Sequence, residues 1–279
     1  MYKRIIEDLK LDQIEESGQC FRFVKTDNPA YLTDARNDVY KTIYKGYYLE
    51  MTQYDKEITF SCDENEFNKV WYEYFDLETD YSAIKDSVDS NDLYLTKAVE
   101  YGDGIRILRQ DLWEMIISFI ISQRKSIPAI RTSIESLCTA YGDEIKLPNG
   151  SSVYAFPTPE KLSKVPFEEL GKHSLGYRDK YIYSIANEVA TGRFNLSELY
   201  TLSPDEALGK LLTIYGVGVK VASCVSLFGL HNIDAFPEDV WIKRIIEEEY
   251  NGVFDKGKYK GFAGVIQQYM FFYGRTVDK

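Results

Sequence analysis

The segment LLTIYGVGVKVASCVSLFGLHNIDAFPEDVWIKR, residues 211–244, predicts two helices joined by a very short turn. The first helix ends near Tyr215, and the second begins at about Val219, after Gly216 and Gly218. Glycine accepts a positive φ and lets the backbone approach another group closely. The N–H groups that open the second helix form an anion site, and a phosphate group fits it. When this segment is taken alone, a plain turn between two helices is the favoured explanation of the glycines.

The lysine that follows the turn stands in an unusual place. Lys220 lies in the first turn of an otherwise apolar helix. The helix dipole disfavours a cation there, and apolar neighbours disfavour any charge. A lysine that is partly uncharged at neutral pH is a nucleophile. The alternative is a side chain that extends past its apolar neighbours to reach water.

An aspartate opens the next helix, nineteen residues further along the chain. Asp239 follows Pro237 and Glu238, and a carboxylate is favoured at a helix N-terminus. The usual role of such an aspartate is an N-cap. A capping carboxylate is also a fixed negative charge, so the two roles are compatible.

The composition excludes several classes of protein. The chain has 279 residues, of which 44% are hydrophobic, enough for one large domain or two ordinary ones. Its only histidines, His173 and His231, do not supply a multi-histidine metal centre. The four cysteines are far apart, which argues against a zinc site, an iron–sulfur cluster or a disulfide framework. No apolar run reaches the roughly 20 residues of a membrane span. We therefore expect a soluble protein of a reducing compartment that needs no metal or cofactor.

The charge is unevenly distributed. The net charge of −11 argues against a nucleic-acid partner when the chain is taken as a whole. Residues 1–104 hold 12 basic and 23 acidic side chains, whereas residues 105–279 hold 21 of each. The whole acidic excess therefore lies in the first third. The basic residues between Arg106 and Arg131 are compatible with a locally positive face, or with an ordinary solvated helix surface.

The rest of the chain predicts an α+β fold. Runs of β-branched, aromatic and alternating residues predict a small antiparallel sheet from residues 39–44, 47–54 and 57–62. Residues 64–101 have helical periodicity, and a glycine-containing breaker ends a first domain at residue 104. The second domain, residues 105–279, is predicted to be helical, with the hairpin at about residues 204–230. Its expected helices span residues 112–123, 127–141, 181–190, 204–214, 220–230, 237–250 and 259–273. The segment between Gly142 and Thr158 is predicted to be a connecting loop.

The motif GVGVK, with a P-x-D segment at this spacing, resembles the helix-hairpin-helix DNA glycosylases. Within that superfamily the chain most resembles the 8-oxoguanine DNA glycosylases. The resemblance implies that Lys220 attacks C1′ of a damaged nucleotide and that Asp239 assists. It also implies that the hairpin, with Gly216 and Gly218, grips DNA phosphates, and that the partner is damaged double-stranded DNA.

Four more positions match the family's base-recognition residues. The resemblance implies that Gly18, in GQCFR, offers its carbonyl to N7–H of 8-oxoguanine, a proton that guanine lacks. It implies that Cys224 lies against one face of the extruded base and Phe271 against the other. Gln267 would read the Watson–Crick edge of the base. Without the resemblance, Gly18, Cys224 and Phe271 are a turn glycine, a small buried thiol and a core aromatic residue.

The segment LGYR, residues 175–178, resembles the family's wedge loop. Tyr177 would fill the space left by the base, and Arg178 would contact the orphaned cytosine, although a plain surface turn is the alternative. Arg124 stands where eukaryotic members have an asparagine, and Ala129 stands where they have an arginine. A preference for cytosine opposite the lesion therefore does not follow. Trp241 occupies a position where many members have a phosphate-contacting histidine, and the resemblance implies that Arg124 and Trp241 both contact DNA.

These patterns predict a bifunctional enzyme that removes 8-oxoguanine and cuts the strand. Two alternatives remain open: a glycosylase for alkylated or deaminated purines, and a non-catalytic DNA-binding module. We expect a monomer that lies with the genome, in the cytoplasm of a bacterium or in the nucleus of a eukaryote.

Overall fold

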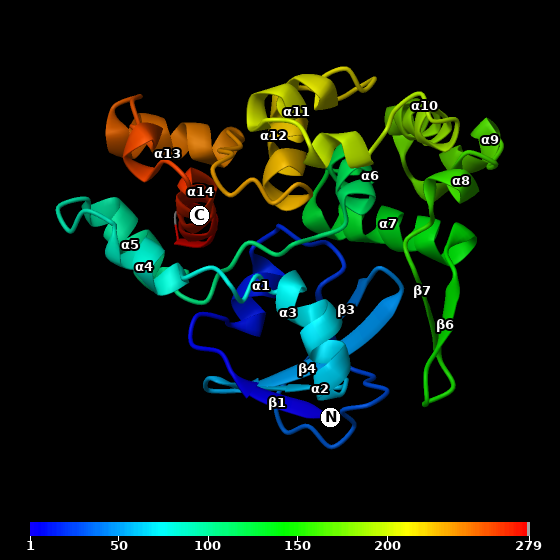
Figure 1. Ribbon diagram of the computed structural model, residues 1–279, viewed down its shortest axis with the longest axis horizontal. Helices are drawn as coiled ribbons and strands as arrows, with labels where there is room; N and C mark the ends of the chain where they lie inside the picture. The colour runs from blue at the N-terminus through cyan, green and yellow to red at the C-terminus, as the bar shows by residue number, and fades with distance from the viewer. Residues whose placement is uncertain (278–279) are drawn as a thin grey trace.

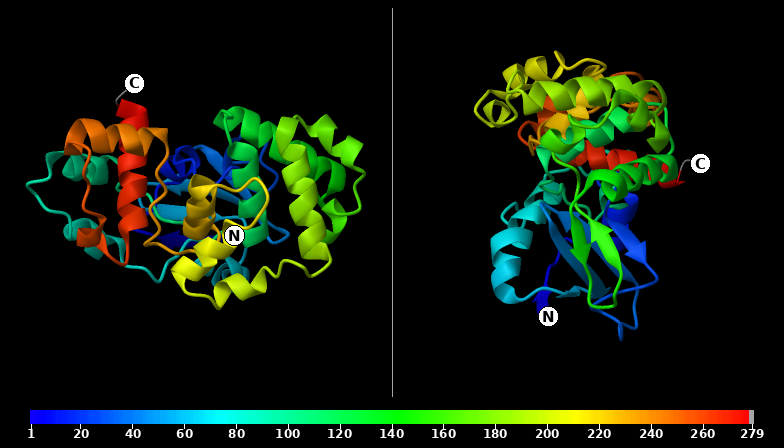
Figure 2. Two further views of the ribbon diagram at one scale, coloured as in Figure 1. Left: turned by 90° about the horizontal axis from the view of Figure 1, so that it is seen from above. Right: turned by 90° about the vertical axis from the view of Figure 1, so that its right-hand side faces the viewer.

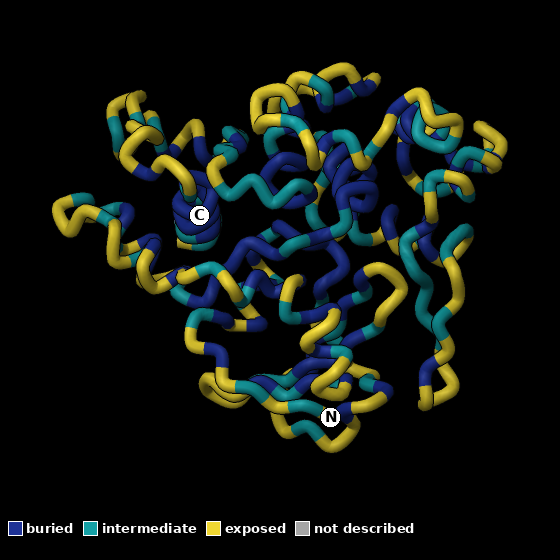
Figure 3. The backbone as a smooth tube through the Cα atoms, viewed as in Figure 1, coloured by how far each residue is buried: buried dark blue, intermediate teal, exposed yellow. Residues whose placement is uncertain are grey.

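The computed structural model describes residues 1–277 and has two layers. A small antiparallel sheet and its flanking helices form one layer, and a larger helical body lies against them (Figure 1). Buried backbone is concentrated inside the two layers and where they meet, whereas the outer loops are exposed (Figure 3). The predicted α+β class is thereby confirmed.

The sheet has five antiparallel strands in the order β1-β5-β4-β3-β2. The strands are β1 (Tyr2–Ile5), β2 (Val24–Thr26), β3 (Val39–Tyr44), β4 (Tyr47–Tyr54) and β5 (Glu57–Phe60). The predicted hairpin is confirmed, because Tyr44 pairs with Tyr47 across the Lys45-Gly46 turn. Both turn residues have positive φ, which suits a two-residue hairpin.

Helices of the first third cover the sheet and reach into the body. They are α1 (Leu11–Glu16), α2 (Glu64–Glu66), the π-helix η1 (Phe67–Trp71), α3 (Tyr72–Tyr74), α4 (Tyr81–Asp86) and α5 (Leu93–Tyr101). Trp71 and Phe75 pack with Leu49 and Phe60 in a core that belongs to the sheet layer. Aromatic residues supply much of this core because each buries a large apolar area.

The helical body contains the predicted helices with small differences at their ends. Its elements are α6 (Leu112–Ser122), α7 (Ile127–Tyr141), α8 (Pro159–Leu162), α9 (Phe167–Leu170), η2 (Gly171–His173), η3 (Gly176–Arg178), α10 (Asp179–Ala190), η4 (Ser197–Tyr200), α11 (Pro204–Leu211), α12 (Val219–Phe228), α13 (Val240–Tyr250), η5 (Lys256–Tyr259) and α14 (Ala263–Val277). Helix α6 has buried residues on every side, as its apolar sequence predicts. It packs against α12, and this contact holds the hairpin on the body.

Residues 81–101 pack with the second part of the chain. Helix α5 lies along α14, and Leu95 and Ala98 belong to the core of the helical body. Figure 1 shows α4 and α5 near α14, away from the sheet. The division at residue 104 remains a prediction about domain organisation. The buried side chains of α4 and α5 belong to the hydrophobic core of the helical body.

The segment between Gly142 and Thr158 is not a plain connection. It contains a second, two-stranded sheet of β6 (Glu144–Lys146) and β7 (Ser152–Tyr154), which extends beside the main sheet (Figure 2). Position 142 requires glycine, because a Cβ on this residue would lie 2.0 Å from the backbone oxygen of Ala155. The strands have three residues each, too few for a clear periodic pattern. Within residues 1–277, no helix has the length and apolar character needed to cross a membrane.

Candidate active site

The hairpin turn depends on the first of its two glycines. Gly216 has φ +85°, and a Cβ on it would lie 2.3 Å from the ring of Tyr181. Gly218 is the N-cap of α12 and has no side chain to satisfy the first N–H groups of the helix. These N–H groups are thus free to bind an acceptor such as a phosphate oxygen.

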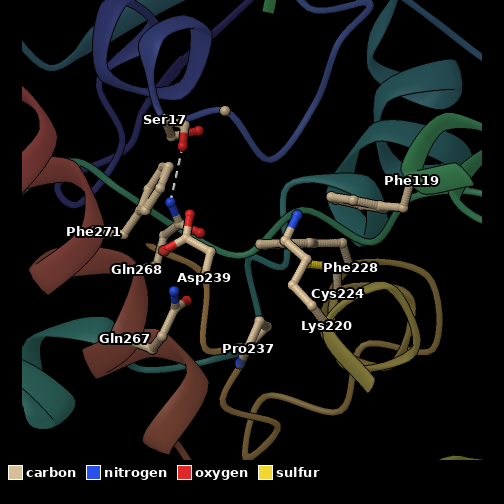
Figure 4. A pocket seen from close by; sticks show the side chains of 11 residues that line it. Ser17, Phe119, Lys220, Cys224, Phe228, Pro237, Asp239, Gln267, Gln268 and Phe271 are labelled. Atoms are coloured by element: carbon tan, nitrogen blue, oxygen red, sulfur yellow. Dashed lines mark hydrogen bonds between the residues drawn. The ribbon is translucent and has the colours of Figure 1, made fainter. Parts of the chain in front are cut away.

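The six residues predicted for catalysis and base recognition line one pocket, called here the inner pocket. It has a volume of about 60 Å³. The residues come from the loop after α1, from α12, from the start of α13 and from α14, and they are Gly18, Lys220, Cys224, Asp239, Gln267 and Phe271. In Figure 4 the side chains of Lys220 and Asp239 point into the pocket, with Phe271 and Gln267 on its α14 side. The fold thus gathers residues that are up to 253 positions apart.

Lys220 differs from its prediction in one respect. The residue is exposed, so burial among the apolar side chains of α12 does not keep its amine from water. This expectation is wrong because the open end of the pocket, rather than the core, faces the first turn of α12. The amine lies 5.5 Å from the centre of the Phe119 ring, and no carboxylate of the described residues forms an ion pair with it.

Asp239 is the N-cap of α13, as predicted. One carboxylate oxygen, Oδ1, accepts hydrogen bonds from the backbone N–H groups of Trp241 at 3.0 Å and Ile242 at 2.9 Å. These bonds fix the carboxylate at the mouth of the pocket, on the side opposite Phe119 in Figure 4. The other oxygen, Oδ2, accepts no bond within residues 1–277. Asp239 therefore offers a held negative charge to whatever enters the pocket.

The base-recognition candidates have the burial that a closed pocket requires. Cys224 is 4% exposed, and burial raises the pKa of its thiol to about 11 even though Lys220 opposes the shift. The thiol is therefore neutral at physiological pH. Gln267 is also 4% exposed, and its Oε1 has no hydrogen-bond partner in the described structure. An unpartnered buried acceptor needs a donor from a ligand or from water.

A larger outer pocket of about 650 Å³ adjoins the inner one. Both are lined by Gly18, Phe119, Lys220, Asp239 and Phe271, so these residues stand at their junction. The basic residues of the outer pocket outnumber the acidic ones, Glu238 and Asp239. The basic residues are Arg124, Lys125, Lys220, Lys243 and Arg275. The site is thus locally positive although the chain has a net charge of −11.

Comparisons with known proteins agree with this geometry. Residues 2–116 match a family model for the 8-oxoguanine DNA glycosylase N-terminal domain, and residues 117–255 match one for HhH-GPD superfamily base excision DNA repair proteins. A structure of 8-oxoguanine glycosylase/lyase from Clostridium acetobutylicum, bound to DNA with cytosine opposite 8-oxoguanine, is 33% identical. The match covers 98% of this chain and 94% of that one, with a TM-score of 0.89. The chain belongs to the 8-oxoguanine DNA glycosylase family.

Two other relatives place the chain within this family. MBOgg1, solved with a low-affinity DNA ligand, is 37% identical with a TM-score of 0.90, and the match covers 100% of both chains. The N-glycosylase/DNA lyase of Saccharomyces cerevisiae is 37% identical over 158 residues. That alignment spans 53% of this chain and 42% of the yeast protein.

Two of the six predicted DNA-contact residues of this glycosylase-family chain line the outer pocket. Arg124, with φ +51°, and Trp241 line the outer pocket itself. Tyr177 lies in η3, does not line either pocket and is 44% exposed. Its ring packs edge-to-face on Tyr181, whose ring covers Gly216.

Arg178 is buried in this structure, and its predicted contact with the orphaned cytosine stays a prediction. It is 6% exposed, and its guanidinium donates to the carbonyl oxygens of Leu175 and Gln123. Gln123 in turn donates its side-chain amide to Gly216 O at 3.1 Å. In this conformation Arg178 joins the predicted wedge loop to the hairpin, and contact with an orphaned base requires it to turn outward.

Several pocket residues escaped sequence reasoning. Phe119 looked like one more core residue of α6, yet it stacks on Phe228 and forms a wall of the inner pocket. Gln268 lines the inner pocket and Arg275 the outer one, but the sequence of α14 does not distinguish them from other residues of a buried helix. Among the described residues, no group of three or more His, Cys, Asp or Glu side chains could hold a metal ion.

Proposed function

We propose that this protein is a bifunctional DNA glycosylase and abasic-site lyase that excises 8-oxoguanine from duplex DNA. The observation that carries the proposal is the convergence of Gly18, Lys220, Asp239 and Gln267 on one pocket. A nucleophile, a fixed carboxylate and two base-reading groups, held by four separate segments, fit a reaction at the sugar of an extruded nucleotide. Family membership adds support, because relatives are named N-glycosylase/DNA lyase.

The junction of the two pockets suggests how the nucleotide enters. The extruded base would take the inner pocket, and its sugar and phosphates would lie in the outer one. The inner pocket is much smaller than the roughly 300–1,000 Å³ of typical ligand pockets, so it must widen as the base enters. Lys220 stands at the boundary, where C1′ of the nucleotide would be. Extrusion itself costs a few kcal/mol of lost stacking and pairing.

The proposed reaction has two steps. In its neutral form, the Lys220 amine attacks C1′ while the C1′–N9 bond breaks, and 8-oxoguanine leaves with the bonding electrons and takes up a proton. The transition state has oxocarbenium character, which the Asp239 carboxylate stabilises. The amine adduct then opens to a Schiff base, and loss of a C2′ proton expels the 3′ phosphate.

The hairpin and the basic residues of the outer pocket would hold the DNA backbone. Phosphate contacts of this kind position a duplex without reading its sequence. The free N–H groups after Gly218 and cations such as Arg124 and Lys243 are suited to that role. Binding should therefore weaken steeply as salt rises, because each phosphate contact releases counterions.

A panel of duplexes tests the proposed substrate. Each duplex carries one lesion, and the released base is measured under single-turnover conditions for 8-oxoguanine, 3-methyladenine, hypoxanthine and uracil. We expect release of 8-oxoguanine to be the fastest, followed by a strand cut 3′ to the lesion. Release of 3-methyladenine without 8-oxoguanine would overturn the substrate, and binding without release of any base would leave a DNA-binding module.

A further inference from the structure

The segment from the last turn of α1 to Gln19 is fixed by side chains on both sides of Gly18. Four of its carbonyl oxygens accept hydrogen bonds from buried or half-buried side chains of other elements. The pairs are Arg131 to Glu15 O at 3.0 Å, Arg275 to Glu16 O, Gln268 to Ser17 O at 2.9 Å and Gln110 to Gln19 O at 2.8 Å. The bond from Gln268 is drawn in Figure 4.

The carbonyl of Gly18 stands apart from this series. It accepts no hydrogen bond from the described residues, although the two carbonyls before it and the one after it are all occupied. Gly18 has φ +77° and lines both pockets. A Cβ on it would lie 3.5 Å from the Phe271 ring and 3.4 Å from the Arg275 guanidinium. The backbone is therefore held on both sides of one free acceptor at the pocket wall.

We propose that Gln268 and Arg275 are positioning residues that hold the Gly18 carbonyl in place and thereby set the preference for an oxidised purine. This inference rests on the proposed function. It adds two residues whose side-chain donors bond the backbone before Gly18, and of these Gln268 also lines the inner pocket. Gln268 is 2% exposed and has its amide donor within the interior, so its bond to Ser17 O does not compete with bulk water.

A carbonyl discriminates between the two bases only if it is held still. The N7 position of 8-oxoguanine bears a hydrogen and donates, whereas N7 of guanine is an acceptor and repels a carbonyl oxygen. A backbone free to rotate could turn its carbonyl away from guanine and lose most of that repulsion. Anchoring Glu16 O and Ser17 O removes this freedom, because the peptide groups just before Gly18 can no longer turn.

Arg275 has a second contact that favours the same outcome. Its guanidinium lies 5.4 Å from the centre of the Phe271 ring. Phe271 is the residue proposed to stack on the extruded base. Arg275 thus contacts both the Phe271 ring and the backbone segment that carries the free Gly18 carbonyl. One side chain therefore helps to hold both groups that would contact the base.

The test separates base recognition from the chemistry of Lys220. Gln268→Met keeps the side-chain length and removes the amide donor. If this variant does not fold, Arg275→Lys removes the guanidinium and keeps the positive charge in the outer pocket. Two single-turnover rates are measured for each protein: release of 8-oxoguanine, and strand cutting at a preformed abasic site, which has no base to recognise. Thr276→Ala is the matched control, because Thr276 lies beside Arg275 in α14 and, within residues 1–277, its hydroxyl bonds only to Phe272 O.

We expect Gln268→Met to slow the release of 8-oxoguanine about tenfold, the ratio that corresponds to one hydrogen bond of about 1.4 kcal/mol. Cutting at the abasic site should change less than about twofold, and Thr276→Ala should leave both rates unchanged. An equal loss of both rates would mean that Gln268 is only structural, and no change in either rate would also overturn the inference. Failure of the wild-type protein to release 8-oxoguanine would instead refute the proposed function.

Discussion

Replacement of Gly216 by alanine tests the hairpin most sharply. Gly216 has φ +85°, a conformation that costs an L-residue about 1–2 kcal/mol. Its new Cβ would also lie 2.3 Å from the Tyr181 ring, so the ring must move. Forcing a methyl group into a packed contact costs about 1–3 kcal/mol more. The expected loss of folding free energy is thus about 2–5 kcal/mol.

Gly218→Ala is the natural control, since it lies in the same turn. Gly218 has a φ of −101°, and a Cβ there meets no atom within 4 Å. Alanine is a poorer N-cap than glycine, so a loss of at most about 1 kcal/mol is expected. For a chain of this size, 1 kcal/mol corresponds to about 2–4 °C in melting temperature.

Thermal unfolding of the two variants, followed by circular dichroism, gives the comparison. We expect Gly216→Ala to lower the melting temperature by about 5–15 °C and Gly218→Ala by less than about 4 °C. Affinity for a duplex with an uncleavable abasic-site analogue, measured below both transitions, should fall for both variants. Equal melting temperatures for the two would refute the assigned geometry of the turn.

Two further substitutions test charges in the body. Asp239→Asn keeps an effective N-cap but removes the negative charge, so base release should fall by about 100-fold or more in single-turnover kinetics, with little change in melting temperature. A loss below tenfold would contradict the electrostatic role. Burial raises the pKa of Glu114 to about 8 from 4.5, so the folded form binds this proton more tightly than the unfolded chain. The contribution of protonated Glu114 to the free energy of unfolding is fully present below pH 4.5. It is lost as the pH rises to about 8. Between pH 5 and pH 8.5, the melting temperature should therefore fall more for the wild-type protein than for Glu114→Gln. An equal fall in both proteins would contradict the burial of the Glu114 carboxyl group.

Local sequence patterns predicted most of the secondary structure. Strands β3 and β4 and helix α7 begin and end at the predicted residues, because each is long enough to show its own period or is bounded by a turn signal. The hairpin of β6 and β7 was missed because its strands are held by pairing with each other and carry little pattern of their own. The formation of such short strands depends on tertiary contacts rather than on local sequence.

Local sequence patterns predicted the residues of the site less completely than they predicted the secondary structure. The spacing of Lys220 and Asp239 is short enough to suggest one centre, but Gly18 and Gln267 are far from both in sequence, and only the family resemblance connected them. The burial expected for Lys220 was wrong because periodicity shows which face of a helix is apolar, not where a pocket opens beside it. The contacts of Arg178 with neighbouring carbonyls could not be predicted either, since they depend on how two loops meet.

Reductive trapping followed by peptide mass spectrometry tests the central claim most directly. The protein is incubated with an 8-oxoguanine duplex and borohydride, which reduces a Schiff base to a stable amine. We predict one covalent adduct per chain, attached at Lys220, and none with Lys220→Gln. An adduct at another residue, or base release without any adduct, would contradict the assignment of Lys220 as the nucleophile.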